Sequence, residues 1–277
     1  MTAGPSPERA GRRSRPEGGK GGAEPASTGT RATPPRGIGA LASGPVWENL
    51  KSIAGAILIF LVVRVFLVEA YRIPTGSMVP TLLIGDWLFV NKLVYGPHIP
   101  FTGVRLPGYA EPQREDVVVF VSPPQPDNAP DTTPTLVKRL WGMPGDTLYM
   151  RAGVLHINGV AYPQGPAFAA NEVDTDGPDS RFAWQRAYGL STSRFGATPS
   201  DPTHDNWGPL VVPPRHYFMM GDNRYMSKDS RYWGFVPRDN IRGRPLFVYY
   251  SYDPERGLDY FRVITEIRWK RLGHRIR

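Results

Sequence analysis

The chain changes abruptly from a polar segment to an apolar one near residue 46. Residues 1–46 are rich in Gly, Pro, Ser and Arg and have almost no large apolar side chains. Such a segment cannot bury enough surface to offset the entropy lost on ordering, so we predict a disordered, basic tail. The run that follows, Ile53–Val63, is continuously apolar, and it resumes after Arg64 as Val65–Val68.

This apolar run has the character of a membrane anchor, which we predict over residues 47–70. At roughly sixteen residues it is shorter than the ~20 that cross a hydrocarbon core, but the long side chain of Arg64 can reach toward the headgroups. A buried core helix is disfavoured because no polar positions alternate along Ile53–Val63 to mark a solvent face. A cleavable signal peptide is disfavoured because the polar segment before the run is far too long.

The pattern beyond the anchor is that of β structure. Short runs of aromatic and β-branched residues are bounded by turn-forming residues, which is typical of strands. Strands are predicted at Trp87–Tyr95, Asp116–Val121, Thr147–Arg151, Val154–Ile157, Val160–Tyr162 and Leu246–Tyr250. Asn158-Gly159 predicts a two-residue hairpin turn. We therefore predict a mainly β fold, with one β-rich domain over residues 71–260 after a single transmembrane helix.

Two stretches differ from the rest of the predicted domain. Residues 165–209 are rich in Gly, Ala, Ser, Asp and Pro, which predicts an irregular insertion or a small cap with few strands. The tail over residues 261–277 mixes apolar and basic side chains. Both a membrane-interface segment and a solvated basic tail fit that composition.

Charge and composition narrow the functional classes. The chain has 33 basic and 25 acidic side chains, but the basic ones concentrate at the two ends, which argues against a nucleic-acid-binding patch. Basic residues before an apolar span keep that side cytoplasmic and place the remainder outside. The chain has no cysteine, which excludes disulfides, thiolate catalysis and cysteine-based metal sites.

Two residues combine into candidate chemistry. Ser77 lies just past the anchor in Pro74-Thr75-Gly76-Ser77-Met78, and Lys138 lies on a later strand-like run. A serine hydroxyl is a poor nucleophile until a nearby base takes its proton. A lysine can be that base only when apolar neighbours bring its pKa from about 10.4 down to roughly 7–8. Val137 and Leu140 are neighbours of this kind.

Each half of this pair is a weak signal alone. Thr-Gly-Ser is common in turns, and a lysine on a strand usually points to solvent, so an outward-facing Lys138 is the simplest alternative. The setting favours the pair, because Gly76 lets the backbone approach a substrate closely and the surrounding apolar residues can keep the lysine dry.

Four separated blocks of sequence resemble the bacterial type I signal peptidases (leader peptidases), which use a Ser/Lys dyad. The blocks are Pro74–Asp86, Arg114–Phe120, Val137–Asp146 and Met220–Pro237, in the order of that family. The resemblance implies an antiparallel β-sheet catalytic domain of the signal-peptidase type. The single predicted span agrees with single-span members, and the insertion lacks the cysteine pair that some relatives carry.

The resemblance implies a role for each candidate residue. Ser77 matches the nucleophile and Lys138 the general base, while Thr75 and the Ser77 backbone N–H match the oxyanion hole. Ser227 matches a serine that hydrogen-bonds to the lysine ammonium and orients it, and Asp229 and Arg231 match a supporting ion pair. The positions that line shallow pockets for small residues at −1 and −3 of a signal peptide match Ile73, Pro74, Met78, Leu82 and Val137. No metal or cofactor is implied.

We therefore expect a membrane-bound serine endopeptidase that removes signal peptides from exported preproteins after an A-x-A-like site. The expected partners are preprotein signal peptides and the lipid bilayer, with the secretion translocon as a candidate neighbour and no nucleic acid. The expected location is the bacterial inner membrane, single-pass, with a cytoplasmic N-terminus and a periplasmic catalytic domain.

Alternatives stay open at this point. A Ser/Lys maturation peptidase of narrow specificity would differ in substrate range, and a non-enzymatic membrane-tethered domain that binds exported chains would show no turnover. A self-cleaving repressor is disfavoured by the anchor. A histidine-based triad is disfavoured because Ser77 is not in G-x-S-x-G and the histidines are scattered. They are His98, His156, His204, His216 and His274.

Overall fold

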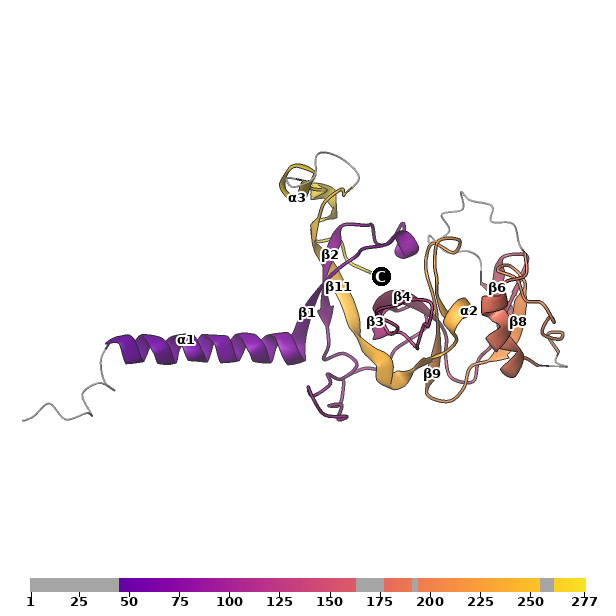
Figure 1. The fold of residues 1–277 in the computed structure, drawn as a ribbon, viewed down its shortest axis with the longest axis horizontal. Coiled ribbons are helices and arrows are strands. Elements are labelled where there is room, and N and C mark those ends of the chain that lie inside the picture. Colours follow the sequence, from indigo (N-terminus) through magenta and orange to yellow (C-terminus); the bar gives the residue numbers. More distant parts are fainter. Residues whose placement is uncertain (1–44, 163–176, 191–193, 255–261) are drawn as a thin grey trace, which may run out of the picture. The chain divides into compact units, whose positions relative to one another are not determined.

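The computed structural model describes residues 45–162, 177–190, 194–254 and 262–277. The chain divides into two compact units, Met1–Lys51 and Ser52–Arg277. The described part of the first unit is the beginning of one helix, and the second unit contains every described strand (Figure 1). The predictions for residues 1–44 lie outside the described residues.

An exposed apolar helix precedes the strands. Helix α1 (Pro45–Val62) continues into a π-helical turn, η2 (Val63–Leu67), and Trp47–Leu67 has a mean hydropathy of 2.3. Its 21 residues correspond to about 31 Å, which is enough to cross a hydrocarbon core. None of its apolar window is buried, so the alternative of a buried core helix is wrong. The helix ends at Leu67 rather than at residue 70, because a strand begins at Val68.

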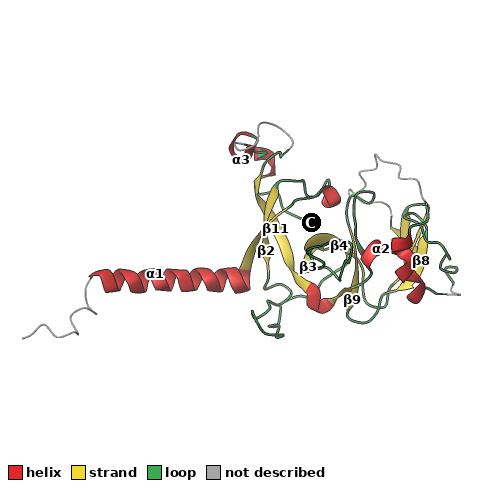
Figure 2. Cartoon of the chain, viewed as in Figure 1, coloured by secondary structure: helices red, strands yellow, loops and turns green. Residues whose placement is uncertain are grey.

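A seven-stranded antiparallel sheet forms the larger part of the second unit, in the order β1-β2-β11-β3-β4-β9-β10 (Figure 2). Its strands are β1 (Val68–Arg72), β2 (Asp86–Asn91), β3 (Val117–Val121), β4 (Thr135–Gly142), β9 (His216–Met220), β10 (Val236–Pro237) and β11 (Ile241–Ser251). Strand β11 pairs with both β2 and β3. A side chain at Gly243 would begin 2.5 Å from the Asn91 carbonyl oxygen, so this close strand crossing requires glycine.

A second, four-stranded antiparallel sheet has the order β7-β6-β5-β8. Its strands are β5 (Thr147–Arg151), β6 (Val154–Ile157), β7 (Val160–Tyr162) and β8 (Trp207–Val211). Asn158 and Gly159 join β6 to β7 with φ of 55° and 91°, the positive values that a two-residue type I′ turn needs. The predicted hairpin is therefore confirmed. The short helices are η3 (Gly76–Met78), η4 (Ser180–Ala187), α2 (Ser230–Trp233), η5 (Arg238–Asn240), α3 (Arg262–Thr265) and η6 (Trp269–Arg271).

Strand β3 is buried on both faces, which explains its uninterrupted apolar sequence. Val117 and Val119 pack with Met78 in one hydrophobic cluster, and Val118 and Phe120 pack in a second cluster on the other face. A third cluster joins the four-stranded sheet to β4 and β9. The strand that carries Lys138 pairs directly with β3, so the candidate lysine lies between packed layers.

The predicted strands are confirmed, with differences at their ends. The run Trp87–Tyr95 ends early, at Asn91, and Leu246–Tyr250 is part of the longer β11. Strands β1, β8, β9 and β10 were not predicted. Strand β1 directly follows the apolar run of the anchor, β8 begins within the predicted irregular insertion, and β9 carries two methionines that indicate only core packing. Of the predicted insertion, residues 165–176 and 191–193 lie outside the described residues, and the remainder holds η4 and the start of β8.

The C-terminal segment packs on the domain instead of extending into solvent. Ile276 is buried in the same cluster as Met78. Arg271 lies 2.5 Å from the fully buried carboxylate of Asp86 and also donates to the Thr81 carbonyl. The segment Arg268–Arg277 is therefore held on the domain at Arg271 and Ile276, while most of its other residues are exposed.

This buried ion pair predicts a stability defect. Replacing Asp86 by alanine leaves Arg271 without its acidic partner and removes the acceptor of the Leu83 N–H and the Ser251 hydroxyl. We expect Asp86→Ala to lower the free energy of unfolding by about 3–5 kcal/mol, measured by urea titration of the full chain in detergent. Asp127→Ala, which breaks the exposed pair with Lys228, is the control and should leave that free energy almost unchanged. Equal effects of the two substitutions would contradict the prediction.

Candidate active site

Ser77 is held in a short turn that follows strand β1. The turn η3 begins after the extended residue Thr75, and Ser77 is 7% exposed. The backbone N–H of Ile73 donates to the Asp86 carbonyl, the N–H of Gly85 donates to the Ile73 carbonyl, and these two bonds close the segment into a loop. The side chains of Met78 and Leu82 are fully buried beneath it. The backbone hydrogen bonds and the buried side chains of Met78 and Leu82 therefore both hold the loop, and the Ser77 hydroxyl has a defined position.

Lys138 points inward, so the alternative of a solvent-facing strand lysine is wrong. It lies in β4, which pairs with β3 on one side and with β9 on the other. Its side chain is only 3% exposed, and its Nζ lies 2.5 Å from the Ser77 Oγ. The structure thus brings together the two residues that the sequence singled out.

Burial sets the charge state of this lysine. Desolvation lowers the pKa of Lys138 from its ordinary value to about 8, because the charged ammonium loses its hydration. The carboxylates of Asp229 and Asp222 act in the opposite direction, and the guanidinium of Arg231 adds to the lowering. A lysine with this pKa is partly neutral near pH 8 and can accept a proton there.

A buried ion pair lies behind the lysine. Asp229 and Arg231 are both fully buried, and two 2.8 Å hydrogen bonds join the guanidinium to the carboxylate. The carboxylate also accepts from the backbone N–H of Gly221 and caps α2 through the N–H of Arg231. Burial raises the pKa of Asp229, but the charge and hydrogen bonds of Arg231 outweigh it and hold this pKa below its usual range. Asp229 is therefore an anion that faces the lysine.

The hydrogen bond expected between Ser227 and the lysine is not present in the structure. Ser227 is 3% exposed and its Oγ has no well-aligned hydrogen-bond partner within the described part of the chain. The hydroxyl lies near the Asp229 carboxylate, where it contributes to the lowered pKa of that group. A side chain at Gly221 would begin 2.1 Å from Ser227 Oγ and 2.6 Å from the carbonyl oxygen of Ser77, so glycine is required there.

Most of the predicted pocket residues gather beside the dyad. Ile73, Met78 and Leu82 are buried in one hydrophobic cluster, and half-buried Val137 packs against it. Pro74 is exposed and lies outside this cluster. The arrangement gives the serine an apolar floor next to an open side.

Sequence reasoning missed a second ion pair at the site. Arg139 makes two hydrogen bonds to the buried carboxylate of Asp222, at 2.8 and 2.7 Å, and Thr81 donates to the same carboxylate. The next residue, Asn223, donates its backbone N–H to the Ser77 carbonyl. The sequence offered no signal for this pair, because neighbours on a strand face opposite sides and Arg139 is then expected to point away from Lys138.

A second missed residue comes from the predicted insertion. His204 Nε2 contacts Arg231 Nη1 and the Arg224 carbonyl oxygen, and its Nδ1 lies 2.7 Å from Asp205. It is buried behind the Asp229–Arg231 pair rather than beside Ser77. The histidine therefore belongs to the packing behind the site, and the sequence offered no signal for this placement.

Comparison with known proteins agrees with this geometry. The family model described as signal peptidase, peptidase S26, matches residues 46–250. Signal peptidase I of Pseudomonas aeruginosa is 37% identical over 227 residues, covering 75% of this chain and 74% of the relative. Signal peptidase I of Aquifex aeolicus is 34% identical, covering 70% of this chain and 80% of the relative.

Among solved structures, a signal peptidase I from Enterococcus faecalis V583 is 31% identical, covering 48% of this chain and 96% of that chain with a TM-score of 0.29. The family match spans both the apolar helix and the candidate dyad. The chain therefore belongs to the signal peptidase I family of S26 serine peptidases, membrane-anchored enzymes that remove signal peptides from preproteins.

Proposed function

We propose that this chain cleaves signal peptides with Ser77 as the nucleophile and Lys138 as the general base. The observation that carries the proposal is the 2.5 Å separation of Lys138 Nζ and Ser77 Oγ in a site where the lysine is 3% exposed. Proximity supplies the path for the proton, and burial supplies a neutral amine to receive it.

The first chemical step forms the acyl-enzyme. Neutral Lys138 takes the Ser77 proton as Oγ attacks the carbonyl carbon of the scissile peptide, and the carbonyl oxygen becomes an oxyanion. The ammonium of Lys138 then gives this proton to the leaving amine as the C–N bond breaks. Water enters next: Lys138 accepts one of its protons as the hydroxide adds to the ester carbonyl. The bond between the acyl carbon and Ser77 Oγ then breaks, Lys138 returns the proton to Oγ, and the carboxylic acid product leaves.

Thr75 and the backbone N–H of Ser77 are proposed to stabilise the oxyanion. Thr75 is exposed and extended, and its hydroxyl does not cap the following turn. This setting leaves the hydroxyl available to the carbonyl oxygen of a substrate on the open side of the loop. Donors that meet the developing charge lower the barrier more than donors to the neutral carbonyl.

Asp229, Arg231 and Ser227 are proposed as positioning residues rather than catalytic ones. They lie behind Lys138, and the charges of Asp229 and Arg231 act on its pKa in opposite directions. The pair thus adjusts the pKa of Lys138 without contact with a substrate. Ser227 fills the space beside Gly221, and its hydroxyl is proposed to help orient the lysine ammonium.

Substrate choice is proposed to depend on the apolar floor beside Ser77. A floor of packed side chains leaves room only for small residues at −1 and −3, which is the A-x-A pattern of signal peptides. The proposed floor residues are Ile73, Met78, Leu82 and Val137, and Pro74 is proposed to contact the substrate from the exposed edge of this floor.

The membrane topology is also a proposal. Basic residues precede the span Trp47–Leu67, which supports a cytoplasmic N-terminus and a periplasmic catalytic domain in a bacterial inner membrane. Enzyme and preprotein then share one bilayer, beside the translocon that delivers the substrate, and this raises their effective concentration.

Loss of either dyad residue should abolish cleavage. Ser77→Ala and Lys138→Ala should each lower kcat/KM by about 10³-fold or more, because nucleophile and base act as one unit. The measurement is cleavage of a purified preprotein, with the new N-terminus identified by mass spectrometry. Lys228→Ala, a lysine paired with Asp127, is the matched control and should retain activity. Cleavage that survives Lys138→Ala would show that the base is another residue. Cleavage of one preprotein among many would indicate a narrow maturation peptidase.

The pH dependence should follow the lysine. Because only neutral Lys138 is active and its pKa is about 8, kcat/KM should fall about tenfold for each pH unit below that value. A profile that stays flat down to about pH 5 would argue against a lysine base.

Asp229→Asn should move the acid limb of that profile to lower pH. The carboxylate raises the pKa of Lys138, and its removal also leaves the opposing charge of Arg231 unbalanced, so both changes lower this pKa. A purely structural role for Asp229 would reduce activity without moving the limb. The conservative variant Asp229→Glu should restore the wild-type limb.

A further inference from the structure

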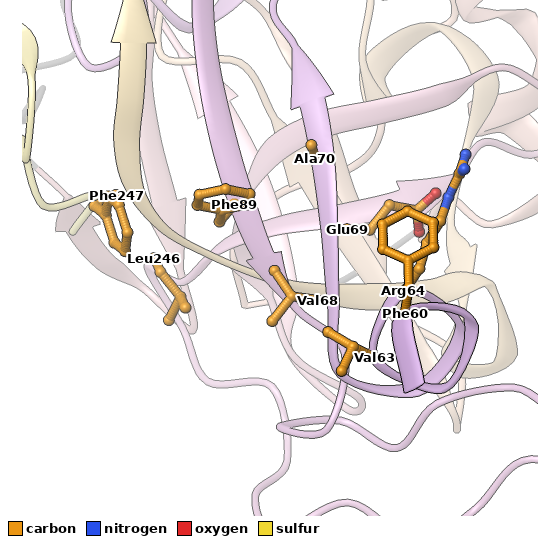
Figure 3. A pocket seen from close by; sticks show the side chains of 9 residues that line it. All are labelled: Phe60, Val63, Arg64, Val68, Glu69, Ala70, Phe89, Leu246 and Phe247. Carbon is orange, nitrogen blue, oxygen red and sulfur yellow. The ribbon is translucent and has the colours of Figure 1, made fainter. Parts of the chain in front are cut away.

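A groove of about 630 Å³ lies where the apolar helix meets the sheet (Figure 3). Its apolar lining comes from the last turns of the helix, from β1 and from the facing parts of β2 and β11. The apolar residues are Phe60, Val63, Val68, Phe89, Leu246 and Phe247. The established reaction uses none of them, and several are exposed, so the groove is an apolar surface without an assigned occupant.

The walls of the groove are held in place by contacts between the helix end and β2. The backbone N–H of Lys92 donates to the Leu67 carbonyl at 2.9 Å, and the Lys92 ammonium donates to the Arg64 carbonyl at 3.3 Å. Phe89 stacks on Tyr249 of β11 with ring centroids 4.1 Å apart. The groove is thus a formed site rather than a gap between loosely connected parts.

The bilayer is the medium that reaches this groove. One wall, with Phe60 and Val63, belongs to the span Trp47–Leu67 itself. A groove walled by the end of a span opens at the depth where the helix leaves the hydrocarbon. Acyl chains are the apolar material present at that depth. An acyl chain that packs into the groove covers its exposed apolar side chains and removes their surface from water.

The polar side of the groove carries a net positive charge. Lys92 and Glu69 form an ion pair at 3.0 Å and neutralise each other. Within the described ranges, no carboxylate lies in ion-pair distance of the neighbouring Arg64. Figure 3 shows Arg64 and Glu69 on the helix side of the groove, away from Leu246 and Phe247. An arginine at the membrane surface is suited to a phosphate, which it binds through charge-assisted hydrogen bonds.

We propose that this groove binds one phospholipid of the surrounding bilayer, with an acyl chain along the apolar lining and the phosphate at Arg64. Strand β1 runs directly from the groove to the loop of Ser77. Five strand residues cover about 17 Å, so a lipid bound at the base of β1 sets the level of the membrane surface relative to the nucleophile. The proposal rests on the membrane anchoring of the chain and not on the assignment of the dyad.

Native mass spectrometry of the full chain in detergent tests the proposal, with phosphatidylglycerol as the titrated lipid. Wild type should bind one molecule saturably. Ala70 lines the groove and is exposed, so Ala70→Trp fills the groove and should weaken this binding by about tenfold or more, the effect of losing roughly two buried methylenes. Ala161→Trp, at an exposed position of β7, is the matched control and should bind as wild type does. Equal binding by Ala70→Trp and wild type would overturn the proposal.

Two further variants keep the test decisive. If Ala70→Trp does not fold, Leu246→Asp places a charge at the exposed rim and should weaken binding in the same way. Arg64→Gln should weaken the binding of phosphatidylglycerol and leave the binding of diacylglycerol, which has the same acyl chains but no phosphate, as it is in wild type. Equal binding of phosphatidylglycerol by Arg64→Gln and wild type would contradict the assignment of the phosphate to Arg64.

The competing occupant is the apolar part of a substrate signal peptide. That occupant predicts that Ala70→Trp raises KM for a full preprotein and leaves phospholipid binding unchanged, which would overturn the lipid assignment. Cleavage of a short soluble peptide that lacks the apolar segment should be the same in wild type, Ala70→Trp and Ala161→Trp. If wild type does not cleave this short peptide, the assignment of Ser77 and Lys138 as the dyad is wrong, whatever the result for lipid binding. Failure of the dyad assignment can therefore be told apart from failure of the lipid assignment.

Discussion

The chemistry of this protein depends on the cost of burying one amine. A lysine that is 3% exposed cannot keep its ammonium hydrated, and its pKa falls from 10.5 to about 8. This shift corresponds to about 3 kcal/mol of native-state destabilisation. Below the folded pKa of about 8, Lys138 is charged in both the folded and the unfolded chain, and the destabilisation is fully present. Between this pKa and that of the unfolded chain, only the unfolded chain holds the proton, so the destabilisation falls as the pH rises. Above the pKa of the unfolded chain, the lysine is neutral in both states and the destabilisation is gone. The fold must supply that energy elsewhere.

The packing around Lys138 offsets this cost through contacts with the neighbouring strands, a buried ion pair and the loop of Ser77. Strand β4 carries Lys138 between β3 and β9, whose apolar side chains exclude water from the amine. The Asp229–Arg231 pair behind it is satisfied internally, so it adds opposing charges without leaving either unpaired. The loop of Ser77 is held from below by the hydrophobic cluster and from the side by the N–H of Asn223. Together these contacts hold Lys138 Nζ and Ser77 Oγ at the short separation on which the proposed proton transfer depends.

The same chain also has to place this site at a membrane. The helix over Trp47–Leu67 passes without a loop into β1, and β1 ends at the loop that holds Ser77. Because no loop intervenes, only the length of β1 separates the end of the span from the loop of Ser77. The groove at the junction of helix and strand lies on this connection, where a bound phospholipid meets both the anchor and the catalytic sheet.

The sequence by itself determined the anchor, most strands, the Asn158-Gly159 turn and the pairing of Ser77 with Lys138. These depend on local composition and periodicity or on motifs that survive in linear order. The tertiary structure alone decided that Lys138 faces inward, that Arg271 closes on Asp86, and that Arg139 and His204 support the site. Each of these depends on partners far apart in the chain, because burial and ion pairing are properties of packed neighbours and a linear pattern does not contain them.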